Sequence, residues 1–334
     1  MSVQHNHIKL TATEISYLWS SYLADTMSDC VLQYFAENIE DSEIKSLVNF
    51  ALDLAQHHIE TIKGIFLKEG IPAPIGFTEK DVNLKAPRLF SDKFYLYYLK
   101  NMAKSGLATI SSVLPNIYRT DVLSFSSECL TASMELSNKV TKLSLEMGLA
   151  VRPPSIPYPK EVEFVQKQSF LLEGLGKRPL TGLEITNLYA NIQTNQLGTS
   201  LATGFSQIAK STKVKDYILR GKAIALKHIK VFSDYLVNSS LPIPMSFDQE
   251  VTDSTESPFS DKLMMYHFNL MIYSGVGNYG MAVSQSQRSD MAVDYSRLLA
   301  EVLKYGEDGI NIMINNQWLE QPPLAIDRKK LAEG

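Results

Sequence analysis

The sequence predicts an all-α protein made of two tandem four-helix bundles. Apolar residues recur at intervals of three and four along long stretches, which is the spacing of one buried helix face. No stretch of any length shows the strand-like alternation of apolar and polar residues. The helical pattern of the first half also recurs in the second half at a domain-sized period, which indicates a tandem duplication.

The duplication is visible in short matching phrases. "LTATEI" from Leu10 matches "LTGLEI" from Leu180, 170 residues later. One residue is then missing from a loop, and "FSDKF" from Phe90 matches "FSDKL" from Phe259, 169 residues later. A single gap over most of the chain indicates two intact copies. The predicted units are a first bundle at 8–165, a linker at 166–179 and a second bundle at 180–330.

The first two helices of the first copy follow from apolar stripes. In the first copy the second stripe ends at "EGIPAPIG", because proline removes a backbone donor and keeps its neighbour out of the helical region. The first stripe consists of Ile15, Leu18, Trp19, Tyr22, Cys30, Val31, Tyr34 and Phe35, and the second of Ile44, Leu47, Val48, Ala51, Ala55, His58, Ile62 and Ile65.

The third helix begins after a link of about 20 residues. Ser91 is its expected N-cap, and Asp92 is favourably placed in its first turn. The fourth helix is expected from near Thr120 to Met147, with Gly148 just beyond its end. Two antiparallel hairpins joined by one long crossover between the second and third helices form the topology of a ferritin-like four-helix bundle.

The bundle order, the duplication and several phrases resemble a known protein family. The phrases are "VNLKAPRLFSDKF", "EVTDSTESPFSDKLMMYH" and "NQWLEQPP". The resemblance is to the ferritin-like domain-of-unknown-function family numbered 3231, from endospore-forming bacilli, and it covers nearly the whole chain. It implies the fold and an intracellular, spore-associated setting, but it implies no reaction.

A di-iron centre of the ferritin-like kind requires a glutamate from each of two helices and Glu-x-x-His from each of the other two. The sequence does not meet this requirement. His58 and His228 occupy equivalent positions on an apolar face, but Ala55 and Ala225 stand three residues before them. We therefore expect no standard di-iron oxidase or ferroxidase.

A degenerate site for a single transition metal ion in the second bundle is the alternative. His228 and His267, with Asp294 or Glu301 from the fourth helix, would supply nitrogen and oxygen ligands, and His58 is the corresponding candidate in the first bundle. His267 is matched by a tyrosine in the first copy, so the pair of histidines is not kept in both copies. The simpler interpretation treats His58 and His228 as core imidazoles hydrogen-bonded to neighbouring helices.

Two further motifs have structural explanations. "GVGNYG" at 275–280 spells the dinucleotide pattern G-x-G-x-x-G, but it lies inside a helix, where small residues let another backbone approach or leave space for a ligand. The acidic link at 248–261 is expected to cross the bundle and cap the next helix. A looser alternative is a cation- or partner-binding loop with Glu250, Asp253 and Glu256.

Composition narrows the class of protein. The chain has 334 residues, 45% hydrophobic and 20% charged, and a formal charge of −4, so it has no basic surplus for nucleic acid. We expect no membrane span, and the start "MSVQHNHIKL" lacks the apolar core of a signal peptide, which favours the cytoplasm. Cys30 and Cys129 are expected to be reduced core thiols.

The sequence thus favours an intracellular, non-catalytic structural or interaction protein, connected with sporulation or stress. Its partner would be another protein or a second copy of itself. The alternative is a protein that binds a metal or a small ligand, with oxidoreductase activity as one form, and with its site in the second bundle.

Overall fold

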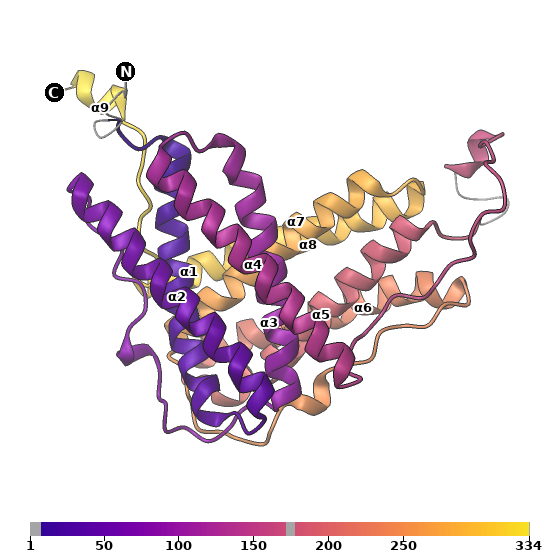
Figure 1. Cartoon of the computed structure of the whole chain (residues 1–334), viewed down its shortest axis with the longest axis horizontal. Coiled ribbons are helices and arrows are strands. Elements are labelled where there is room, and N and C mark those ends of the chain that lie inside the picture. The colour runs from indigo at the N-terminus through magenta and orange to yellow at the C-terminus, as the bar shows by residue number, and fades with distance from the viewer. Residues whose placement is uncertain (1–7, 172–177, 334) are drawn as a thin grey trace.

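The structure is a computed structural model that describes residues 8–171 and 178–333. Residues 172–177 of the predicted linker at 166–179 lie outside the described residues. In Figure 1 the helices of the first repeat lie on the left, those of the second extend to the right, and the two sets meet near the centre.

The all-α class is confirmed. In the described parts of the chain the backbone forms helices and two isolated β-bridges, and no strand. The main helices of the first repeat are α1 (Ala12–Asn38), α2 (Ser42–Glu69), α3 (Asp92–Val113) and α4 (Thr120–Glu146). Those of the second repeat are α5 (Gly182–Ile208), α6 (Thr212–Asn238), α7 (Asp261–Gln285) and α8 (Ser289–Asn315). Single turns of 3-10 helix are η2 (Glu79–Asp81), η3 (Leu114–Asn116), η4 (Gln168–Phe170) and η5 (Asp248–Glu250), and α9 (Arg328–Glu333) is short.

Local sequence signals explain where these helices begin and end. Thr11 and Thr181 start the two repeats with the same capping box, in which each threonine and a glutamate three residues later satisfy one another's backbone N–H groups. Ser91 caps α3 as predicted, because its hydroxyl accepts a hydrogen bond from the N–H of Phe94. Gly148 follows α4 in the left-handed region at φ 69°, where glycine is favoured.

The core is divided into three clusters of buried apolar residues. One lies in the first repeat around Phe125 and one in the second around Phe232. The third and most extensive cluster contains residues of both repeats, among them Phe35, Phe94 and Phe205. The two repeats are therefore joined by a common core as well as by the linker.

The two crossovers pair with each other by an internal twofold relation. Val82 bridges Phe259, and Phe90 bridges Val251, both antiparallel. Each pair is the image of the other under the 169-residue repeat, since Val82 is equivalent to Val251 and Phe90 to Phe259. The same relation holds at the next residues: the Ser91 N–H donates to the Glu250 carbonyl at 2.9 Å, and the Ser260 N–H donates to the Asp81 carbonyl at 3.0 Å. Residues 81–91 of the first crossover and 250–260 of the second thus form a clasp that joins the two repeats.

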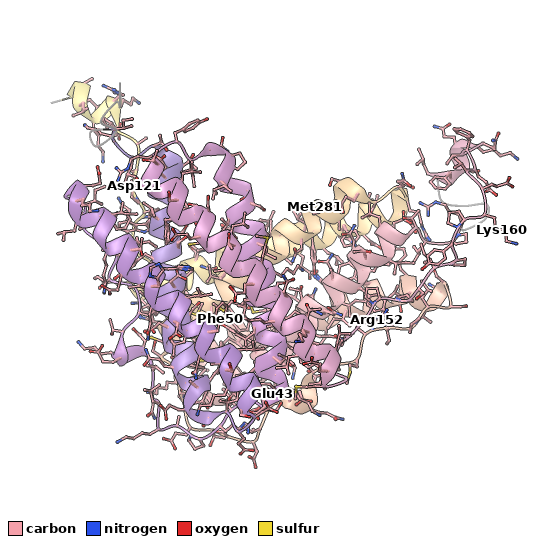
Figure 2. The ribbon with its side chains drawn as sticks, in the orientation of Figure 1. Glu43, Phe50, Asp121, Arg152, Lys160 and Met281 are labelled. Carbon is pink, nitrogen blue, oxygen red and sulfur yellow. The ribbon has the colours of Figure 1, made fainter. Side chains whose placement is uncertain are left out.

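Each repeat also sends the segment after its last helix onto the other repeat. After α4, the carbonyl of Val151 accepts a hydrogen bond from Gln193 of α5 at 3.1 Å. Figure 2 shows this segment continuing from Arg152 to Lys160 along the second repeat. After α8, the carboxylate of Glu320 accepts hydrogen bonds from the N–H groups of Ile75 and Gly76 in the first crossover, at 2.8 and 2.7 Å. Exchanged segments of this kind hold the pair closed.

Candidate functional site

His58 lies in a row of three polar side chains inside the first bundle. Its Nδ1 is 3.5 Å from the carboxylate of Asp25 on α1, and its Nε2 is 3.3 Å from the Sγ of Cys129 on α4. The ring of Phe125 stands edge-on to the imidazole, with centroids 5.5 Å apart. The row therefore joins three helices through the centre of the bundle, and it has the order Asp–His–Cys.

The electrostatics of this row favour a charged imidazole. Burial opposes the charged form, but the hydrogen bonds with Asp25 and Cys129 outweigh it and raise the pKa of His58 to about 10. The thiol of Cys129 is 2% exposed and lies in the apolar cluster of the bundle. Such a thiol is withdrawn from solvent reagents, so the row is built to hold helices together.

His228 occupies the equivalent place in the second bundle with different partners. Its Nδ1 is 2.9 Å from the hydroxyl of Tyr279 on α7, and its Nε2 is 3.1 Å from the carboxylate of Glu301 on α8. Glu301 also accepts a hydrogen bond from Lys227 at 2.9 Å. The Tyr279 oxygen accepts a hydrogen bond from Asn195 of α5 at 2.8 Å, so all four helices contribute to the network.

The second network favours a neutral imidazole. His228 is fully buried, and this burial lowers its pKa more than the Glu301 contact raises it. The two equivalent histidines thus have opposite pKa shifts, because Asp25 of the first bundle is matched by Asn195 in the second. Duplication has kept the imidazole and reversed the direction of its pKa shift.

The remaining metal-ligand candidates lie apart from His228 and Glu301. His267 is in the shared core, where its Nε2 is 2.8 Å from the hydroxyl of Tyr98. Asp294 accepts a hydrogen bond from the hydroxyl of Tyr235 at 2.9 Å. Over residues 8–171 and 178–333, no three His, Cys, Asp or Glu side chains form a group suited to one metal ion.

The partner of His267 is its own counterpart. The 169-residue repeat relates Tyr98 to His267, so the two residues occupy equivalent positions and meet where the repeats are related to each other. The sequence predicted that this position differs between the copies, but it did not predict the contact. The signal in the sequence was that this position of an apolar helix face carries a polar group in both copies, Tyr98 in the first and His267 in the second.

Three partners of the bundle histidines were not predicted from the sequence: Asp25, Cys129 and Tyr279. Each is a polar or ionisable group within an apolar helix face. Asp25 follows Tyr22 by three residues in the first stripe, which is a signal that it points inward. Its partner could not be predicted, because spacing within one helix does not show which side chain of another helix it meets.

The glycines of "GVGNYG" do not serve close helix packing, contrary to one prediction. A Cβ added at Gly275, Gly277 or Gly280 would meet no neighbouring atom within 4 Å. Close approach occurs instead at Gly204 of α5, where an added Cβ would lie 2.7 Å from the ring of Phe90 in the first crossover. Gly204 is therefore one of the positions where a neighbour leaves little room for a side chain, and it lies where the two repeats meet.

The acidic link forms part of the clasp. Glu250 accepts a hydrogen bond from the hydroxyl of Ser91, while Asp253 and Glu256 are exposed. The link ends at Ser260, whose hydroxyl accepts a hydrogen bond from the Leu263 N–H at 3.1 Å and caps α7, as predicted.

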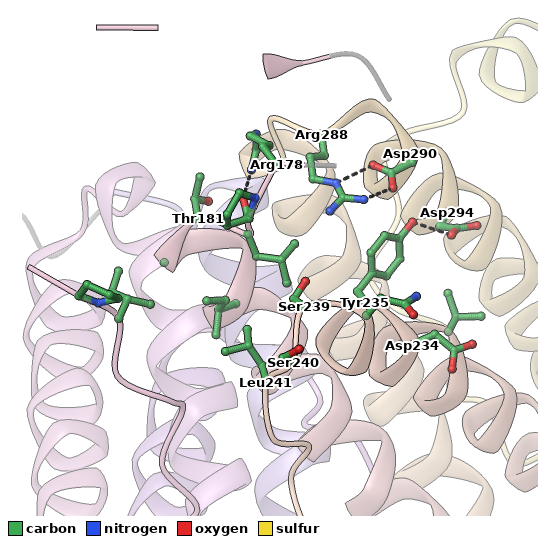
Figure 3. A pocket seen from close by; sticks show the side chains of 18 of the residues that line it. Arg178, Thr181, Asp234, Tyr235, Ser239, Ser240, Leu241, Arg288, Asp290 and Asp294 are labelled. Atoms are coloured by element: carbon green, nitrogen blue, oxygen red, sulfur yellow. Dashed lines mark hydrogen bonds and ion pairs between the residues drawn. The ribbon is translucent and has the colours of Figure 1, made fainter. Parts of the chain in front are cut away.

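A cavity of about 750 Å³ lies where α5 and α8 begin and α6 ends (Figure 3). Its arginines are paired with neighbouring carboxylates: Arg178 donates to Glu184 at 2.8 Å and Arg288 donates to Asp290 at 3.0 Å. Tyr235 and Asp294 form a further pair on its wall. Both arginines of this cavity are thus neutralised by carboxylates next to them.

Known proteins were compared with this chain. No curated protein matches it. A crystal structure of a "putative spore coat protein" from Bacillus halodurans C-125 is similar to 45% of this chain and 98% of its own, with 18% identity and a TM-score of 0.42. None of the helices in the described part of the chain combines the length and apolar character that a membrane crossing requires. The model of the protein family of unknown function DUF3231 matches residues 1–162 and again 170–331, and the chain therefore belongs to this family, in two tandem copies.

Proposed function

We propose that this protein is a non-catalytic structural or interaction protein in which two ferritin-like repeats act as one fused pair. One observation supports this most directly: both ring nitrogens of His58 and of His228 contact partners from their own bundle. An imidazole engaged on both sides has no free nitrogen for a substrate. Satisfied polar networks of this kind make a core rigid and specify its packing.

The setting of this proposal is a bacterial cell that forms spores. The resemblance to a family of endospore-forming bacilli adds a cytoplasmic, spore-associated location and a role in sporulation or stress. The partner would be another protein or a second copy of the chain. On α7, Tyr273 and Met281 are 62% and 56% exposed, and they are the apolar side chains that such a partner would contact on the second repeat. Figure 2 shows the position of Met281.

Complementation of a strain lacking this chain tests the proposal. We expect the strain to form fewer heat-resistant spores, and a folded double variant His58→Gln/His228→Gln to restore the number, because neither imidazole takes part in chemistry. A matched double variant, Tyr273→Glu/Met281→Glu, changes only the exposed surface and is expected to fail. If the folded histidine variant failed and the surface variant succeeded, the imidazoles would have a chemical task and the proposal would be wrong.

The second candidate function is binding of a single transition metal ion or small ligand in the second bundle, with oxidoreductase activity as one form. The contact between His228 and Glu301 favours it, because it brings a nitrogen and an oxygen donor within 3.1 Å of each other. Elemental analysis of untagged protein, grown with iron, manganese and zinc and purified without chelators, tests this candidate. About one equivalent of a metal that is lost in His228→Ala would support it. Metal content unchanged by that substitution would exclude this site.

A further inference from the structure

A cavity of about 510 Å³ lies at the seam between the two repeats. Its walls come from α3 and α4 of the first repeat, from α5 of the second, from the segment after α4 and from the second crossover. Tyr97 of α3 and Phe247 of the second crossover stack in its wall with ring centroids 4.1 Å apart. Leu107, Val151 and Leu197 add further apolar surface. The cavity has the size and the apolar lining of a small-molecule site.

Two lysines line this cavity and carry its only formal charges. Lys100 and Lys104 are four residues apart on α3, so their side chains extend from the same face of the helix. No aspartate or glutamate lines the cavity. Among the described residues, neither ammonium group has a carboxylate partner, and Lys104 donates only to the hydroxyl of Thr194, at 3.3 Å.

This arrangement is unfavourable for the protein alone. Desolvation lowers the pKa of both lysines, although part of Lys100 is exposed, and the neighbouring charge of Lys100 lowers the pKa of Lys104 further. In a chain with more acidic than basic residues, carboxylate partners for two lysines are not scarce. The equivalent positions of the second repeat are Asn269 and Tyr273, so only the first repeat has this pair of lysines.

We infer that this cavity binds a small organic anion with an apolar body, such as a medium-chain aliphatic carboxylate. The carboxylate accepts hydrogen bonds from Lys100 and Lys104, and the chain lies against the stacked rings and the aliphatic side chains. The ligand supplies the negative charge that the cavity lacks and shields the two ammonium groups from each other. Polar neighbours such as Gln193 and Thr194 orient the head group.

Isothermal titration calorimetry with octanoate tests the inference on the full-length chain. We expect one binding site per chain and about tenfold or greater loss of affinity in Lys104→Met, since a charge-assisted hydrogen bond is removed. Octanamide, which has the same chain without the charge, is expected to bind about tenfold more weakly or worse for the same reason. Lys93→Met is the matched control, because Lys93 is an exposed lysine of the same helix outside the cavity.

A second variant fills the cavity without removing a charge. Ala108 is an exposed residue of the lining, and Ala108→Trp should abolish octanoate binding while the circular dichroism of the folded protein stays unchanged. The inference is overturned if octanoate does not bind at millimolar concentration, if octanamide binds equally well, or if Lys104→Met and Lys93→Met have the same affinity. These outcomes are independent of the proposed structural role, which the spore assay tests.

Discussion

The hydrogen bond between Tyr98 and His267 offers a direct test of how the repeats are joined. The two side chains are 6% and 5% exposed, so their polar atoms are withdrawn from water. Replacing Tyr98 by phenylalanine removes the hydroxyl and leaves the imidazole Nε2 buried without that partner. Because an orphaned buried polar group costs about 1–3 kcal/mol, we expect Tyr98→Phe to lower the free energy of unfolding by this amount.

The reciprocal change completes a double-mutant cycle. His267→Phe orphans the Tyr98 hydroxyl and is expected to cost about 1–3 kcal/mol, with an added packing cost from the larger ring. In the double variant neither orphan remains, so its loss should be smaller than the sum of the single losses by about 1–3 kcal/mol. Urea titrations followed by far-ultraviolet circular dichroism give the four free energies of unfolding.

The cycle has a control within the same helix. Tyr97 is buried next to Tyr98 but stacks on Phe247, so Tyr97→Phe combined with His267→Phe should give additive losses. Additive losses for the Tyr98 and His267 pair itself would refute the reasoning, because the 2.8 Å contact would then contribute nothing to the joining of the repeats.

Three further predictions follow from single residues. Burial lowers the pKa of His267 to about 4, so the unfolded state binds a proton at a pH where the native state does not. The free energy of unfolding should therefore fall by an amount on the order of 3 kcal/mol as pH drops from about 6.5 to 4. Urea titrations at several pH values should show that His267→Phe has lost this acid sensitivity. Gly277→Ala should raise the free energy of unfolding by about 0.5–1 kcal/mol, because the added methyl group enters open space. Gly204→Ala should lower it by about 1–3 kcal/mol, because the methyl group meets the ring of Phe90, and equal effects of the two variants would contradict this difference in packing. Lys104→Met should stabilise the ligand-free protein at neutral pH, because it removes a charge that is less favourable in the folded state than in the unfolded state. This gain should shrink as pH rises towards 10.5, because the folded protein then loses the lysine charge at a lower pH than the unfolded chain does. Thermal melts of both proteins at pH 7 and pH 10 test the direction of the change.

Much of the secondary structure could be predicted because its causes are local. Ser91 and Gly148 mark helix ends through their own backbone and side-chain chemistry, and the structure places both as expected. The long crossovers follow from prolines that stop a helix. The close helix packing predicted for the glycines at 275–280 is wrong, because whether another helix approaches a small residue depends on a different part of the chain.

The sequence by itself determined the all-α class, the duplication and the equivalence of positions such as His58 and His228, because periodicity and repetition are properties of the chain alone. Tertiary structure decided the rest. It alone showed that Asp25 contacts one of these histidines while Tyr279 and Glu301 contact the other. These contacts join side chains of different helices, and residue spacing within one helix does not show which helices meet. The contacts between the crossovers, and the cavity whose two lysines have no carboxylate partner among the described residues, arise for the same reason. They exist only where two repeats pack against each other.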